Sequence, residues 1–279
     1  MVTVPDLIRM RECGEKIIAL TAYDYTFARI LDQAGVHLLL VGDSLGTVFQ
    51  GHSSTLPVTL EEILYHTRAV VRGTKQALIV SDLPFLSYQT GVRDALLAGG
   101  RLLKEGGAAA VKLEGGRHVA ETVRAMTDAG IPVLGHIGLT PQSVHVMGGY
   151  RVQGVDEASA ATLLEDAQIL EASGAFGIVL EGIPRLLAAE ITGTLTIPTI
   201  GIGAGPDCSG QILVLHDALG LTQFEGEPPR FVKQFGALAE AATAAVAEYR
   251  REVLTGEFPA ERHCYHGKRA RALKRVTPT

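Results

Sequence analysis

Three carboxylate side chains, Asp43, Asp82 and Glu114, close successive short apolar runs of this sequence. Brought together without a cation, such groups would repel one another and hold protons more tightly. A hard divalent cation relieves that repulsion, and oxygen ligands with room for water and substrate favour Mg²⁺ over zinc. The three residues therefore predict a magnesium site. The alternative is an ion-pair network in which Lys112 neutralises the carboxylates.

A fourth carboxylate, Glu181, closes a later run, with Ile178-Val-Leu before it and Gly-Ile-Pro after it. Burial favours the neutral form of a carboxyl group and makes its anion a stronger base. We therefore predict that Glu181 is a general base, the alternative being a cap for the helix near Pro184. His136 closes another run, and a single histidine there is more typical of a hydrogen-bonded wall residue than of a metal ligand.

Eight apolar runs must position these side chains. They are continuous rather than alternating in polarity, which is typical of strands buried on both faces. Helical patterns separate them, so we expect a single (β/α)₈ TIM-type barrel, with a doubly wound sheet as the alternative. In a barrel all the carboxyl ends open on one face, where the active site lies. The runs cover residues 16–21, 37–43, 77–82, 109–114, 131–136, 176–181, 197–201 and 211–217, the last ending in His216-Asp217.

The intervening segments carry helix signals. The clearest helix starts at Thr59, where Glu62 completes a capping box, and Gly73 fits a cap at its carboxyl end. Residues 202–210 are too short for a full helix. Other helices are expected near 25–34, 92–104, 118–129, 156–173 and 184–192, and a final helix over about 231–254 should bury Phe231, Phe235, Leu238, Ala242, Val246 and Val253.

The chain has 279 residues, 47% of them apolar, which excludes a disordered protein and suffices for a barrel of about 250 residues. We predict one catalytic barrel domain over residues 1–261 and a basic tail over 262–279. The tail holds six Lys or Arg and no Asp or Glu. The other 19 basic and 30 acidic residues leave a net charge of −11 on the body, which argues against nucleic acid as the partner.

Targeting signals and cysteine spacing bear on the compartment. No apolar run reaches the roughly 18 residues of a membrane span, and residues 1–11 lack the features of an export signal. Cys13, Cys208 and Cys264 lie far apart and form no Cys-x-x-Cys pair, as expected of reduced thiols. We therefore expect a cytoplasmic protein with no membrane partner.

A glycine-rich loop, Gly201-Ile-Gly-Ala-Gly205, follows the seventh run, where barrels often bind phosphate. Its spacing differs from that of the dinucleotide-binding fingerprint, so it is a weak nucleotide signal. A tight backbone turn past a neighbouring group explains the glycines equally well.

Longer motifs resemble those of the ketopantoate hydroxymethyltransferase (3-methyl-2-oxobutanoate hydroxymethyltransferase) family, in order over about residues 5–266. The chain departs from the family pattern at residues 206–209, where an acidic residue more commonly precedes Gly210. The matching motifs are Thr21-Ala-Tyr-Asp-Tyr25, Val41-Gly-Asp-Ser-Leu-Gly46, Ser54-Thr-Leu-Pro-Val58, Asp82-Leu-Pro-Phe85, Val111-Lys-Leu-Glu-Gly-Gly116, Gly135-His-Ile-Gly-Leu-Thr-Pro-Gln-Ser143, Gly148-Gly-Tyr-Arg-Val-Gln-Gly154, Ile197-Pro-Thr-Ile-Gly-Ile-Gly-Ala-Gly205 and Gly210-Gln-Ile-Leu-Val214.

The resemblance implies an enzyme of pantothenate and coenzyme A biosynthesis. Such enzymes transfer a one-carbon unit from 5,10-methylenetetrahydrofolate to 3-methyl-2-oxobutanoate, giving 2-dehydropantoate through a Mg²⁺-stabilised enolate. It further implies a homo-oligomer, typically a decamer. Carried over to this sequence, it implies Asp43, Asp82 and Glu114 as magnesium ligands, Asp43, Ser44, Asp82 and Lys112 as contacts of the oxo acid, His136 as a pocket residue and Glu181 as the proton acceptor.

Three other functions stay open at this point. Lys112 could be the nucleophile of a Schiff-base aldolase. A lyase or mutase of the phosphoenolpyruvate-mutase type would share the fold and the metal, but its Lys-x-Cys-Gly-His signature is absent. A non-catalytic oligomeric binding protein could keep the fold, although the intact set of carboxylates argues against it.

Overall fold

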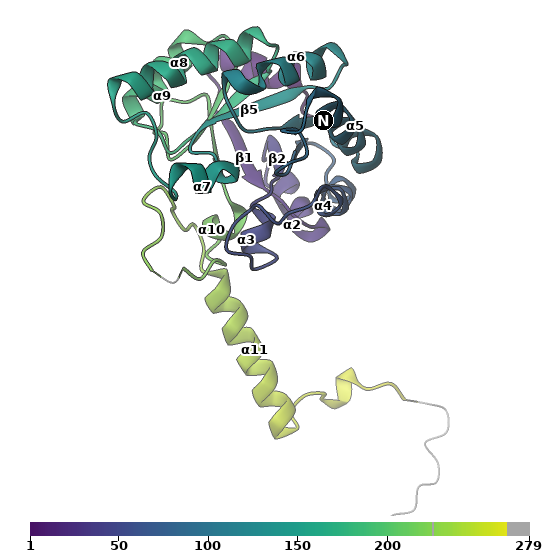
Figure 1. Ribbon diagram of the computed structural model, residues 1–279. Coiled ribbons are helices and arrows are strands. Elements are labelled where there is room, and N and C mark those ends of the chain that lie inside the picture. Colours follow the sequence, from purple (N-terminus) through teal and green to yellow (C-terminus); the bar gives the residue numbers. More distant parts are fainter. Residues whose placement is uncertain (225, 267–279) are drawn as a thin grey trace, which may run out of the picture.

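A computed structural model describes residues 1–224 and 226–266 of the chain (Figure 1). Eight parallel strands, each paired with the next, form a closed barrel that ends with β8 beside β1. The barrel prediction is therefore confirmed, and the doubly wound alternative is wrong. The strands are β1 (Ile17–Thr21), β2 (Leu38–Val41), β3 (Leu78–Asp82), β4 (Ala110–Lys112), β5 (Val133–Gly138), β6 (Gly177–Glu181), β7 (Thr199–Ile202) and β8 (Gly210–Leu213).

Helices surround the barrel and follow most of the strands (Figure 1). As expected, no helix separates β7 from β8. The α-helices are α1 (Val4–Glu12), α2 (Tyr25–Gln33), α3 (Leu45–Val48), α4 (Leu60–Gly73), α5 (Val92–Arg101), α6 (Ala120–Asp128), α7 (Val144–Met147), α8 (Glu157–Ala172), α9 (Arg185–Thr194), α10 (Leu215–Ala218) and α11 (Leu238–Thr255). Shorter helical turns are η1 (Leu102–Gly106), η2 (Arg117–Val119), η3 (Pro141–Ser143) and η4 (Glu261–His263).

Two separate apolar clusters stabilise this arrangement. The barrel interior is filled by alternate residues of the strands, such as Ile17 and Ala19 of β1, and α1 adds Leu7 to it. A larger cluster lies between the outer face of the strands and the helices. The interior cluster ends below the polar residues at the carboxyl ends of the strands, so it forms the floor of the site described below.

Helix α4 begins as predicted, but its end differs from the prediction. Thr59 and Glu62 form the capping box, with the Thr59 N–H donating to Glu62 Oε2 at 2.7 Å. Gly73 is the last helical residue rather than a left-handed cap. A Cβ at Gly73 would lie 2.6 Å from the Tyr25 carbonyl oxygen and 2.9 Å from the Ala28 Cβ. Glycine is therefore needed there for the close approach of α2 and α4.

The prediction for the last helix was wrong in position and in burial. Helix α11 begins at Leu238 and projects away from the barrel (Figure 1). None of its residues is buried, and the six apolar side chains expected to be covered are all exposed, Val246 by 65%. The amphipathic pattern is real, but nothing in the described part of the chain buries these six side chains. No helix in the described part of the chain has the length and apolarity needed to cross a membrane.

Five strand ends, those of β2, β4, β5, β7 and β8, also differ from the sequence prediction. Strand β8 stops at Leu213, so His216 and Asp217 lie in α10 rather than at a strand end. Glu114 comes two residues after β4, and His136 lies within β5. The polar side chains predicted at the carboxyl ends of the strands therefore come from the strands and from the loops that follow them. Most of the basic tail, residues 267–279, lies outside the described residues, and the boundary at residue 261 stays a prediction.

Candidate active site

A cavity of about 100 Å³ lies at the carboxyl ends of the strands. Its apolar floor includes Leu40 and Val179 of the barrel interior. All the residues that the sequence predicted for the site line this cavity, namely Asp43, Ser44, Asp82, Lys112, Glu114, His136 and Glu181. Apart from Ser44 and Glu181 they are buried.

Asp43 and Asp82 lie together because they follow neighbouring strands, β2 and β3. The Asp43 backbone N–H donates to Asp82 Oδ2 at 3.0 Å. Burial and the adjacent Asp82 carboxylate raise the pKa of Asp43 well above its ordinary value. Burial also raises the pKa of Asp82, although Lys112 opposes the shift. The predicted repulsion between these carboxylates is therefore present.

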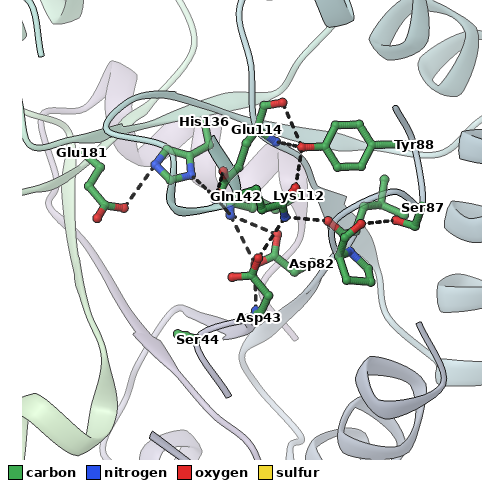
Figure 2. Close-up of polar contacts among 12 residues, drawn as sticks. Asp43, Ser44, Asp82, Ser87, Tyr88, Lys112, Glu114, His136, Gln142 and Glu181 are labelled. Atoms are coloured by element: carbon green, nitrogen blue, oxygen red, sulfur yellow. Dashed lines mark hydrogen bonds and ion pairs between the residues drawn. The ribbon is translucent and has the colours of Figure 1, made fainter. Parts of the chain in front are cut away.

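Lys112 bridges two of the carboxylates from the end of β4 (Figure 2). Its Nζ lies 3.0 Å from Asp82 Oδ1 and 3.1 Å from Glu114 Oε1. Burial disfavours the ammonium form, but Asp82 and Glu114 outweigh burial and raise the pKa of Lys112 well above its ordinary value. Lys112 is thus a buried cation at neutral pH.

His136 joins the carboxylates to Glu181 on the other side of the cavity (Figure 2). Its Nε2 lies 3.2 Å from Glu181 Oε2, and its Nδ1 lies 3.5 Å from Glu114 Oε1. Burial and Lys112 lower the pKa of His136, but the two carboxylates outweigh them and raise it to about 9. Burial alone would raise the pKa of Glu114, but the nearby Lys112 and His136 outweigh burial and lower this pKa to about 2.

The sequence reasoning did not select Gln142 or Tyr88, which hold the carboxylates in place. Gln142, in η3, donates from Nε2 to Asp43 Oδ2 at 2.9 Å, and its backbone N–H donates to Glu114 Oε2 at 3.0 Å. The Tyr88 hydroxyl donates to Gln142 Oε1 at 2.8 Å. Both side chains are buried. The one signal available was the place of Gln142 in a long motif, because neither residue type is itself diagnostic of this chemistry.

Ser44 follows Asp43 directly and is partly buried. Its Oγ lies 2.8 Å from the hydroxyl of Tyr23, a buried residue just after β1. The pair places a hydroxyl beside the carboxylates at the cavity wall, where it can contact a polar group of a ligand.

The charges of the cavity suit a divalent cation. Four carboxylates face two cationic groups, Lys112 and His136, so complete ionisation leaves two negative charges in a buried space. The raised pKa of Asp43 reduces that charge by favouring a proton. Asp82 Oδ1 is buried, and its polar contact within the described residues is the ion pair with Lys112 Nζ at 3.0 Å. Oxygen donors and unbalanced negative charge are the features that Mg²⁺ requires.

The carboxylates are nevertheless engaged with other groups in this structure. Among residues 1–224 and 226–266, no three His, Cys, Asp or Glu side chains converge at metal-ligand spacing. Lys112 pairs with Asp82 and Glu114, while Gln142 donates to Asp43. The ion-pair network that the sequence left open is therefore present, and the magnesium site stays a prediction.

A much larger groove, of about 1290 Å³, adjoins the cavity. Ser44, Thr55 and Glu181 line both spaces, so the two are adjacent at these residues. His216 and Asp217, which the sequence placed at the end of the eighth strand, line the groove and not the small cavity. The loop after β7 contributes Gly203 and Gly205. The site thus has a small compartment lined by the charged cluster and a much larger one beside it.

Solved structures with this architecture include enzymes of small acids. The complex of phosphonopyruvate hydrolase with oxalate and Mg²⁺ matches with a TM-score of 0.61 at 14% identity, covering 94% of this chain and 93% of that one. For 2,3-dimethylmalate lyase the TM-score is 0.57 at 18% identity, covering 93% and 90%. Identities this low show the fold alone.

Sequence relatives are far more similar. Proteins named 3-methyl-2-oxobutanoate hydroxymethyltransferase from Geobacter metallireducens and Geobacter sulfurreducens are 57% and 58% identical over 263 residues, covering 94% of this chain and 98% of each relative. That from Pelobacter propionicus is 56% identical over 265 residues, covering 95% and 97%. The family profile described as ketopantoate hydroxymethyltransferase matches residues 1–261. The resemblance is confirmed, and the chain belongs to the ketopantoate hydroxymethyltransferase family of transferase enzymes.

Proposed function

We propose that this enzyme transfers a hydroxymethyl group from 5,10-methylenetetrahydrofolate to 3-methyl-2-oxobutanoate, giving 2-dehydropantoate for pantothenate synthesis. C3 of the oxo acid loses a proton and forms a bond to the methylene carbon. The two bonds from that carbon to N5 and N10 of the folate break, water supplies the hydroxyl group, and the C3 proton and the remaining water proton end on the two nitrogens. The observation that carries the proposal is the position of Glu181, which lines both the charged cavity and the large groove.

Glu181 is proposed as the base that removes the C3 proton. Its side chain retains 16% exposure, whereas Asp82 and Glu114 are almost completely enclosed and paired with Lys112. His136 contacts Glu181 Oε2 at 3.2 Å and orients the carboxylate without occupying both of its oxygens. Glu181 therefore has an oxygen available at the junction where the oxo acid and the one-carbon donor would meet.

The other side of the cavity is proposed to hold the carboxylate and keto oxygen of the oxo acid. Asp43, Asp82 and Glu114 would hold Mg²⁺, which when bound polarises a carbonyl group and acidifies the adjacent C–H. The Lys112 ammonium supports the negative charge that develops on the keto oxygen during deprotonation. Ser44 contributes a hydroxyl contact.

The Schiff-base alternative fits the geometry poorly. A lysine nucleophile needs a neutral amine, but Asp82 and Glu114 keep Lys112 protonated. Two buried carboxylates would lose their shared cation if that amine formed an imine. Borohydride added with the oxo acid should therefore trap no covalent adduct.

Turnover of 3-methyl-2-oxobutanoate in a fourfold design tests the function: with and without methylenetetrahydrofolate, each with and without Mg²⁺. We expect 2-dehydropantoate only when both are present, with activity lost in EDTA and restored by excess Mg²⁺. Full turnover in EDTA would exclude the metal, and no turnover in the complete mixture would exclude the proposed reaction.

We further propose that the enzyme self-associates, as a homodecamer by family resemblance. Helix α11 exposes apolar side chains, including Val246 and Val253, and Ile18 on the outer face of β1 is 52% exposed. A second copy of the chain could cover these surfaces. Sedimentation velocity should show an oligomer that Val246→Glu combined with Val253→Glu converts to smaller species, and a monomeric wild type would contradict the proposal.

A further inference from the structure

The large groove contains groups for which the chemistry at Glu181 has no use. Aromatic and aliphatic side chains form much of its lining, including Tyr150, Val152, Phe224 and Phe231. Its volume of about 1290 Å³ greatly exceeds that of the small cavity. The groove therefore has room for a ligand much larger than a five-carbon oxo acid, with substantial apolar and aromatic surface of its own.

The glycine-rich loop after β7 shapes one wall of this groove. Gly203 has a φ of +63°, and a Cβ there would lie 2.9 Å from the Phe231 ring. Glycine thus allows the ring of Phe231, which comes from the segment before α11, to pack directly on the loop. Gly203 and the Phe231 ring thus form an aromatic-faced wall, which gives the loop a role other than phosphate binding.

Asp217, in α10, supplies a carboxylate to the same groove. It is partly buried, and its Oδ1 accepts a hydrogen bond from Thr222 Oγ1 at 2.6 Å. Within the described ranges its carboxylate makes no other hydrogen bond, and the buried Nδ1 of the adjacent His216 is also unpaired. Oδ2 therefore keeps its acceptor capacity in surroundings where an unpaired charge is costly.

We propose that Asp217 binds the pyrimidine edge of the reduced pterin ring of the folate co-substrate. That edge carries the N3–H and the 2-amino group side by side, and a carboxylate accepts two such neighbouring donors in a paired geometry. The aromatic wall at Phe231 suits the flat ring system, and Arg230, exposed in the same groove, suits the glutamate carboxylates. This inference rests on the proposed function, from which folate follows.

Binding of tetrahydrofolate to the full-length enzyme, measured by calorimetry, tests this role. Asp217→Asn keeps an acceptor for Thr222 but presents an amide N–H₂ to the ligand's own donors. We expect Kd to rise about 10- to 100-fold, the scale of lost hydrogen bonds to a charged group. Glu121→Gln, which changes an exposed carboxylate on α6 outside the groove, is the matched control and should leave Kd unchanged.

A ligand variant separates recognition from general damage to the groove. A 2-desamino-2-methyl tetrahydrofolate lacks the 2-amino donor, so the wild type should bind it about tenfold more weakly than tetrahydrofolate. Asp217→Asn should lose that discrimination. Equal Kd values for tetrahydrofolate in wild type and Asp217→Asn, or full discrimination retained by the variant, would overturn the inference. Wild-type enzyme that binds no folate and gives no turnover would instead count against the proposed function.

Discussion

Replacing Glu181 with glutamine should abolish exchange of the C3 proton of 3-methyl-2-oxobutanoate with solvent deuterium. The amide has nearly the shape of the carboxylate but cannot accept the proton. Positioned general bases contribute about 10²- to 10⁴-fold to rates, so we expect exchange to fall by that factor in Glu181→Gln. Proton NMR of the oxo acid in D₂O with saturating Mg²⁺ measures it without folate.

Binding of the oxo acid distinguishes loss of the base from loss of the site. The cluster of Asp43, Asp82 and Lys112 does not contact Glu181 directly, so the Kd of the oxo acid should change little. Glu190→Gln, at an exposed position on α9, is the matched control and should exchange at the wild-type rate. Exchange in Glu181→Gln at the wild-type rate would assign the base elsewhere.

The convergence of the carboxylates was predictable because it follows from topology. Asp43, Asp82 and Glu114 close or follow β2, β3 and β4, and parallel neighbours in a closed barrel bring such residues to one face. Glu181 faces them from β6 by the same rule. No side-chain coordinates are needed for this inference, only the order of the apolar runs.

Other features depend on contacts that no local pattern records. Gln142 lies far along the chain from Asp43, in a short turn whose sequence shows no chemistry, and only the fold brings its amide to that carboxylate. The apolar residues Leu213-Val-Leu215 extend the eighth apolar run past the end of β8. The sequence therefore predicted His216 and Asp217 at the end of a strand, whereas both lie in α10.

The error at α11 has a different physical origin. An amphipathic pattern indicates that one helix face needs a partner surface, but it does not tell whether that surface belongs to the same chain. The exposed side chains of Val246 and Val253 show that the barrel of this chain is not the partner. The pattern therefore indicates that this helix face can pack against an apolar surface, but it does not identify that surface.

Replacing Lys112 with methionine should separate the role of the ammonium from that of a metal ion. Methionine keeps much of the side-chain volume and removes the charge that lies 3.0 Å from Asp82 and 3.1 Å from Glu114. If the ammonium supports negative charge developing on the keto oxygen, exchange at C3 should fall about 10²- to 10³-fold, as when one preorganised donor is removed.

The affinity of Lys112→Met for Mg²⁺ should not fall along with the rate of exchange at C3. In the structure the ammonium pairs with Asp82 and Glu114, two of the carboxylates proposed to hold Mg²⁺, so its removal frees both of them and increases the negative charge of the cavity. Calorimetry should therefore show Mg²⁺ binding at least as tight as in the wild type, whereas Asp82→Asn should weaken it. Removing one partner of a buried ion pair costs about 3–5 kcal/mol of stability, so circular dichroism must first confirm a folded variant. Weakened Mg²⁺ binding together with unchanged exchange in Lys112→Met would contradict both expectations. The ammonium would then hold the carboxylates in place without stabilising charge on the keto oxygen.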